Sequence, residues 1–147
     1  MTISSSNTNA RWSYTGDGAT TVFVYDNKIF VDSDLKVYVD GALKTLTTDY
    51  TVSGAGTPDG GNVTFVTAPV AAAVVVFIRD VAASQQSKYV DGDTFPAKVI
   101  EDDFDRAVIL SQQIKDEQGR KVGLAATSTE TYSMALPAAP AAGQFLT

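Results

Sequence analysis

The stretch FPAKVIEDDFDRAVILSQQIKDEQGR, residues 95–120, has the pattern of one long amphipathic helix, whereas the rest of the sequence has the patterns of strands and turns. We predict that the helix occupies residues 94–121. At 1.5 Å per residue its regular part would be roughly 34 Å long. Because no second helix is predicted, the apolar side of this one must be buried on the protein's own sheet or on other copies of the chain.

The two ends of the predicted helix carry recognisable signals. Asp93 and Thr94 are plausible capping residues, Pro96 fits the first turn, and Gly119 fits the end. Four acidic residues crowd the first half, namely Glu101, Asp102, Asp103 and Asp105. Basic residues follow toward the end, an order that would complement the helix dipole.

The apolar positions of this helix alternate in steps of four and three, which is the spacing of a coiled-coil seam. These predicted interface residues are Ile100, Phe104, Ala107, Ser111, Ile114 and Gln118. A second line widens the apolar face and comprises Val99, Ala107, Val108 and Leu110. Two interpretations follow. The helix packs on its own sheet, as surface helices of small domains usually do, or one face rests on the sheet while the seam meets symmetry-related copies.

Residues 11–93 have β signals throughout and form a predicted β domain. Expected strands lie at residues 21–25, 35–39, 42–46, 50–52, 63–66 and 74–78. Asp40-Gly41 predicts a tight hairpin, and the uninterrupted apolar run at 74–78 predicts a central strand covered on both sides. The expected fold class is mainly β, a small antiparallel β-sandwich or curled sheet of about six strands followed by one long amphipathic α-helix.

Composition excludes many functions. The 147-residue chain has a formal charge of -6 and contains neither Cys nor His. The acidic balance argues against binding to nucleic acid or to an anionic membrane, and the missing residue types remove the usual thiol, triad and zinc chemistries. We therefore expect no catalytic residues, no metal and no cofactor. The first residues lack the pattern of a signal peptide, which predicts synthesis in the cytoplasm.

Several features occur in an order that resembles one protein family. They are the hairpin exit LTTDYTV at 46–52, the strands VTFV at 63–66 and VFIR at 76–79, and the helix with Glu101, Asp105, Arg106 and Gln112-Gln113. Over roughly residues 12–120 the chain resembles the N-terminal anchor domain of tail fibres and tailspikes of short-tailed phages. One departure is Ala71-Ala72-Ala73, which stands where relatives commonly have a Gly-containing turn.

The resemblance implies a homotrimer located in the virion tail. Such domains attach the fibre or spike to the tail through adaptor and nozzle proteins, carry no catalysis, and reach the host receptor only through a distal part. Residues 1–10 would then be a flexible arm and residues 122–147 a connector toward that part. Tentative tail-binding residues are Trp12, Tyr14, Arg79 and Arg106.

Parts of the sequence also suggest other functions. The acidic cluster at 101–105 invites comparison with the two carboxylates of a glycosidase, but neighbouring residues on a helix point in different directions. The main alternative is a carbohydrate-binding β-sandwich module, in which exposed aromatic side chains would recognise the sugar. A depolymerase would require a further downstream domain.

Overall fold

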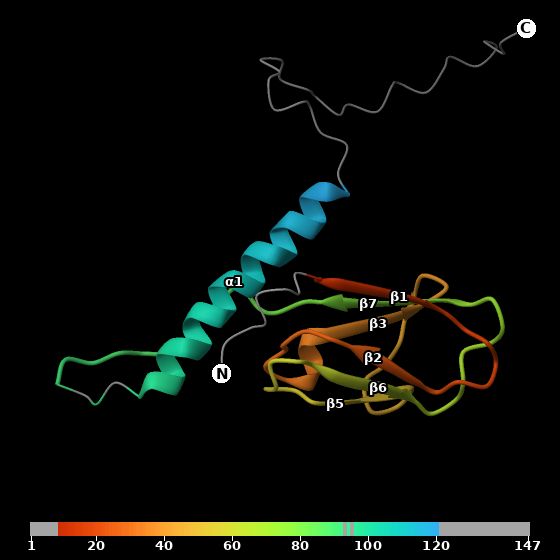
Figure 1. The fold of residues 1–147 in the computed structure, drawn as a ribbon, viewed down its shortest axis with the longest axis horizontal. Coiled ribbons are helices and arrows are strands. Elements are labelled where there is room, and N and C mark those ends of the chain that lie inside the picture. Colours follow the sequence, from red (N-terminus) through yellow and green to blue (C-terminus); the bar gives the residue numbers. More distant parts are fainter. Residues whose placement is uncertain (1–8, 93, 95, 121–147) are drawn as a thin grey trace, which may run out of the picture.

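In the computed structural model, residues 9–92, 94 and 96–120 are described. They form two antiparallel sheets packed face to face, followed by one long helix, so the predicted fold class is confirmed (Figure 1). The larger sheet has the order β1-β7-β3-β4, formed by Arg11–Thr15, Val74–Arg79, Leu35–Val39 and Ala42–Leu43. The smaller sheet has the order β2-β6-β5, formed by Val22–Tyr25, Gly61–Phe65 and Tyr50–Ser53. A short 3-10 helix, Asp32–Asp34, precedes β3.

The core lies between the two sheets. Alternate residues of each strand point inward, and the buried set includes Trp12, Phe23, Tyr25, Leu35, Val37, Tyr50, Val63, Phe65, Val75 and Phe77. The ring of Phe23 meets Phe65 and Phe77 edge to face, with centroids 5.7 and 6.4 Å away, and so joins the two sheets. Each such side chain contributes roughly 2 kcal/mol through removal of its surface from water.

The hairpin predicted at Asp40-Gly41 is confirmed. Both residues have positive φ, 50° and 79°, as a type I′ turn requires. The second strand is shorter than the predicted 42–46, because the side chain of Asp49 accepts a hydrogen bond from the Thr45 N–H and bends the chain into a loop. The turn at Ala71-Ala72-Ala73 also forms, with Ala72 at φ 67° in the left-handed region that glycine adopts most readily.

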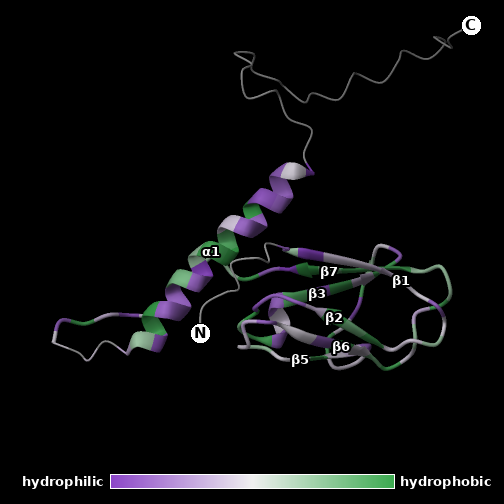
Figure 2. Ribbon diagram, in the orientation of Figure 1, coloured by the Kyte–Doolittle hydropathy of each residue, from purple (hydrophilic) through white to green (hydrophobic). Residues whose placement is uncertain are grey.

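Strand β7 lies between β1 and β3, as predicted for the apolar run. The prediction that both of its faces are covered is wrong. Val75, Phe77 and Arg79 are buried, but Val74 is exposed and Val76 only half-buried. Figure 2 shows hydrophobic ribbon along β3 and β7, and Figure 1 shows that α1 runs past the end of the sandwich and leaves the outer face of this sheet uncovered.

Helix α1 comprises Ala97–Gly119. Pro96 is the N-cap residue rather than a residue of the first turn, and no side chain caps this end of the helix. Thr94 precedes the helix, and Asp93 lies outside the described residues. Gly119 is the last helical residue rather than the residue that stops the helix, and Arg120 is the C-cap.

The predicted dipole complementation is also wrong. The first turn contains no acidic residue and the last turn no basic one. The acidic residues begin one turn later and make contacts to other parts of the chain, which are described below.

The ends of the chain lie mostly outside the description. Residues 1–8 of the predicted arm and the predicted connector at 122–147 are not among the described residues. Asn9 and Ala10, also assigned to the arm, are held against the sandwich: the Asn9 carbonyl accepts a bond from Asn27, and the Ala10 carbonyl accepts one from the Arg79 N–H. The arm prediction is wrong for these two residues. Within the described part, no helix is long and apolar enough to cross a membrane.

Candidate functional site

The helix contacts its own domain at one end of the sandwich, through loops and the ends of strands β1 and β7. Its partners are the loop after β2, the segment after β7 and the start of β1 (Figure 1). The expectation that one face of the helix rests on the sheet is therefore wrong. The residues after β7 carry the chain past the end of the sheet before α1 begins, so the helix lies beside the sandwich.

The central contact is a buried ion pair. Lys28 Nζ donates to Asp105 Oδ2 at 2.7 Å and to Asp102 Oδ1 at 2.8 Å. Lys28 is 2% exposed and Asp105 is also buried. A buried charge of this kind is tolerated only because it is paired. Asp102 additionally accepts a bond from Lys98, one turn earlier on the helix.

The ion pair shifts the ionisation of its members. Burial alone would lower the pKa of Lys28, but the hydrogen bonds and charges of Asp102 and Asp105 outweigh it, and the pKa is raised. Burial would raise the pKa of Asp102, but the hydrogen bonds and charges of Lys28 and Lys98 outweigh the effect of burial, and the pKa is lowered. Both shifts stabilise the charged forms at neutral pH.

Two glutamines extend this polar contact along the helix. Gln112 Oε1 accepts a bond from Arg79 Nη2, and the side-chain amide of Gln113 bonds both the N–H and the carbonyl of Val81. These two hydrogen bonds to the Val81 backbone resemble those that a neighbouring β-strand would make. Arg79 is 2% exposed, and burial lowers its pKa to about 10.

Only a small apolar cluster accompanies these polar contacts. Ile109 is fully buried against Val81, with Phe30 packed beside them. The guanidinium of Arg106 lies 4.3 Å from the centroid of the Phe30 ring, and Lys28 approaches the same ring at 5.1 Å. Cation–π contacts of this kind contribute about 0.5–2 kcal/mol.

The domain-facing side of α1 consists of Asp102, Asp105, Ile109, Gln112 and Asp116. At 3.6 residues per turn, the predicted seam lies on the opposite side of the helix. Phe104 is 70% exposed and Ile114 55% exposed; Ala107, Ser111 and Gln118 are exposed and Ile100 is half-buried. The helix thus turns its polar side toward its own domain and its apolar side toward solvent.

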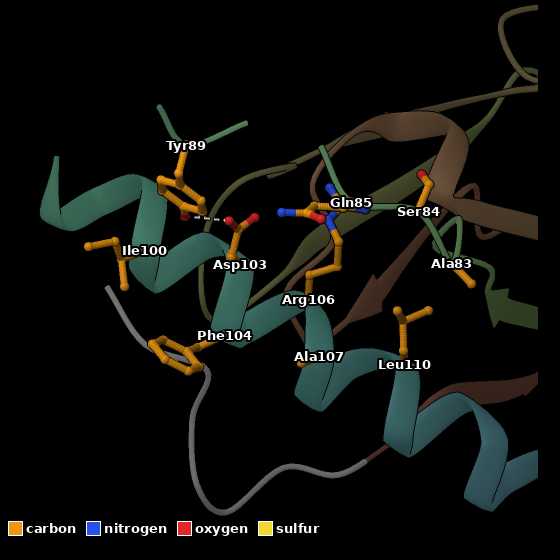
Figure 3. Close-up of a pocket in the computed structure, with 10 residues that line it drawn as sticks. All are labelled: Ala83, Ser84, Gln85, Tyr89, Ile100, Asp103, Phe104, Arg106, Ala107 and Leu110. Atoms are coloured by element: carbon orange, nitrogen blue, oxygen red, sulfur yellow. Dashed lines mark hydrogen bonds between the residues drawn. The ribbon is translucent and has the colours of Figure 1, made fainter. Parts of the chain in front are cut away.

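A groove of about 670 Å³ borders this apolar side (Figure 3). One wall is the linker segment, residues 83–89 between β7 and α1, and the other is the helix itself. Its helix residues include Ile100, Phe104, Ala107 and Leu110. Asp103 holds the linker segment by accepting bonds from Tyr89 at 2.5 Å and from Ser87 at 2.9 Å.

The predicted tail-binding residues do not form one surface. Trp12 is buried in the core, where its indole N–H donates to Asp26, and the Tyr14 hydroxyl donates to the Val24 carbonyl. Arg79 is buried beneath α1, and Arg106 lies on Phe30. Tail binding by these four residues stays a prediction. Because Trp12 and Arg79 are buried, they stabilise the domain rather than offer a surface for direct contact with a tail protein.

Sequence reasoning missed Lys28 and the internal partners of the acidic cluster. Lys28 lies in a loop without periodicity, and its partners are 74 and 77 residues away in the sequence. The family resemblance had already marked Asp105 and Gln112-Gln113, and all three contact the domain. The sequence did contain one signal for these contacts, a polar stripe at heptad spacing on the side of the helix opposite the apolar stripe.

The fold and this surface define a small structural β-sandwich with an exposed, seam-bearing helix. No family model matches the sequence. The chain is similar to the tail spike protein of Salmonella phage epsilon15, with 37% identity over 108 residues. The match covers 69% of this chain but only 10% of that protein. This chain is therefore related to part of a phage tail spike, which supports a structural role in a phage tail.

Proposed function

We propose that this chain is the anchor module of a tail fibre or tailspike of a short-tailed phage. Three copies associate through the seams of their α1 helices. The resulting trimer attaches the receptor-binding fibre to the virion tail by contacts with adaptor and nozzle proteins, and three identical contacts give avidity that one would lack. The chain itself carries no catalysis.

The observation that carries this proposal is the orientation of the helix. A helix that belonged to a monomer would bury its apolar side on its own domain. Here the buried side holds an ion pair and two glutamine contacts, whereas Phe104 and Ile114 face solvent. Exposed apolar surface of this kind marks an interaction site, and the coiled-coil spacing fits identical helices around an axis.

The similarity to a tail spike protein supports the same proposal. The chain spans about a tenth of that relative's length. The acidic side chains that resembled a hydrolase pair are occupied: Asp102 and Asp105 bind Lys28, and Asp103 binds Tyr89 and Ser87. This supports a module that positions other parts of the virion.

The test is sedimentation of the purified chain. The unmodified protein should sediment as a trimer, and Phe104→Asp or Ile114→Asp should convert it to a folded monomer, because a charge at a seam position would face two identical charges at the axis. Val70→Asp, at an exposed position on a turn remote from the seam, is the matched control and should remain trimeric. A stable monomer of the unmodified protein would refute the proposal.

No observation favours the carbohydrate-binding alternative. Among the described residues, the exposed aromatic side chains are Tyr89 and Phe104, on the linker segment and the helix, whereas the aromatic residues of the sandwich are buried or half-buried. Glycan binding by the isolated chain, without affinity for tail proteins, would reverse this choice.

A further inference from the structure

The groove between the linker segment and α1 lies on one flank of the seam only. Its walls share Ile100, Phe104 and Ala107 with the seam, and Leu110 and Asp103 line the flank beside them (Figure 3). In the seam's heptad, where Phe104 takes position a and Ala107 position d, the groove-bearing flank carries the g positions. Any helix that packs on the seam therefore also meets this groove.

The opposite flank carries the e positions Glu101, Val108 and Lys115. Val108 is 48% exposed and apolar, and it makes no part of the small cluster under the helix. It lies across the helix from the groove. The helix thus offers an apolar side chain on one flank and an apolar recess on the other.

A parallel arrangement about a threefold axis brings these two flanks together at each interface, because every contact is head-to-tail around the ring. The g position of one helix then faces the e position five residues later on the next. Asp103 would face Val108 of the neighbouring copy, and Leu110 would face the aliphatic stem of its Lys115. No like charges meet in this pairing.

An antiparallel pair of helices places the flanks differently. It would turn the two groove-bearing flanks toward each other, so the two linker segments would compete for one space. It would also place Asp103 against Glu117 twice, and the attraction of Glu101 to Lys115 would only offset that repulsion. The position of the groove favours the parallel ring.

We infer that the groove formed by the linker segment and α1 receives the helix of the adjacent copy of this chain, with Val108 as the side chain that enters it. This inference rests on the proposed trimer and assigns to the linker segment a direct role in the interface. The linker connects β7 to α1, so each β domain would be clamped to the neighbouring helix as well as to its own.

Engineered cysteines test this contact, since the chain has no Cys of its own. Gln85→Cys combined with Val108→Cys places one thiol on the groove wall, on the linker segment near Asp103 (Figure 3), and one on the opposite flank of the helix. A bond within one chain is excluded because the helix stands between the two, and disulfides need Cα atoms within about 7 Å. Mild oxidation should yield covalent dimers and closed trimers on a non-reducing gel.

Two further pairs make the result decisive. Leu110→Cys with Lys115→Cys reports on the parallel seam without involving the linker, and Val70→Cys with Val108→Cys is a remote control that should stay monomeric on the gel. If the seam pair forms covalent trimers and the groove pair does not, the groove inference fails while the proposed trimer stands. If neither pair cross-links and the chain sediments as a monomer, the proposed function fails as well.

Discussion

Single side chains decide how the helix is held. Lys28 binds two carboxylates at once, and together with Phe30 it forms the contact between the loop after β2 and α1. Attraction between such charges in a buried place offsets their desolvation only while both partners are present. Loss of Lys28 removes the cation that balances the buried charge of Asp105.

Replacing Lys28 with methionine should lower the free energy of unfolding by about 3 kcal/mol, because Asp105 would keep a buried charge without its partner. Urea-induced unfolding, followed by the fluorescence of the buried Trp12, measures the effect. Lys98→Met is the matched control. Lys98 binds the same Asp102, but its side chain is 78% exposed, so its loss should cost less than about 0.5 kcal/mol. Equal losses in the two variants would contradict the assigned role of Lys28.

At the level of secondary structure, the helix is the element whose environment differs most from expectation. Its contacts to the domain are mainly polar, with Ile109 as its only fully buried apolar residue among those described. Polar contacts have strict geometry, so they hold the helix at one orientation and keep the seam turned outward. Their strength depends on the ionisation of the residues involved.

The stabilising effect of the Lys28 contact should therefore depend on pH in two windows. The pKa of Asp102 is lowered from its ordinary 3.8, so its contribution is complete above that value and is lost as the pH falls through the lowered pKa. The pKa of Lys28 is raised from 10.5, so its contribution is complete below that value and is lost as the pH rises through the raised pKa. The difference in unfolding free energy between the unmodified chain and Lys28→Met should be constant from pH 5 to 9 and shrink below about pH 4. A difference that persists unchanged at pH 3 would show that the contact is not ionic.

At the scale of the whole molecule, the sandwich and the helix differ in how much apolar surface they leave exposed. The sandwich is closed around its core, whereas the helix leaves a line of apolar residues in solvent. In the proposed trimer this module would gain stability by association, because the seam would be buried between copies.

Stability should therefore depend on protein concentration. For a trimer, a tenfold dilution should cost about 1 kcal/mol per chain and lower the Tm by roughly 2–4 °C in calorimetry. Phe104→Asp should have a Tm that does not change on dilution. A concentration-independent Tm for the unmodified chain would argue that the seam remains exposed in solution.

Local patterns were sufficient for most of the secondary structure. Asp40-Gly41 defines its hairpin because both residues adopt positive φ readily. Apolar patterns place six of the seven strands observed among the described residues within a few residues of their bounds, whereas β1 was not among the expected strands. Most residues that the heptad spacing assigns to the seam are exposed, and their role in a trimer interface stays a prediction. These features depend on neighbours a few residues apart, which a sequence displays directly.

The side of the helix that faces the domain depended on contacts between residues far apart in the chain. Lys28 reaches Asp105 across 77 residues, and Gln113 reaches Val81 across 32. An acidic stripe is equally compatible with solvent, with the helix dipole and with a buried lysine, and spacing alone does not distinguish them. The packed structure resolves the choice, because only one arrangement pairs the buried Lys28. The sequence of residues 95–120 thus predicts a helix with a line of apolar positions at heptad spacing. The tertiary contacts determine that this line faces solvent rather than the sandwich.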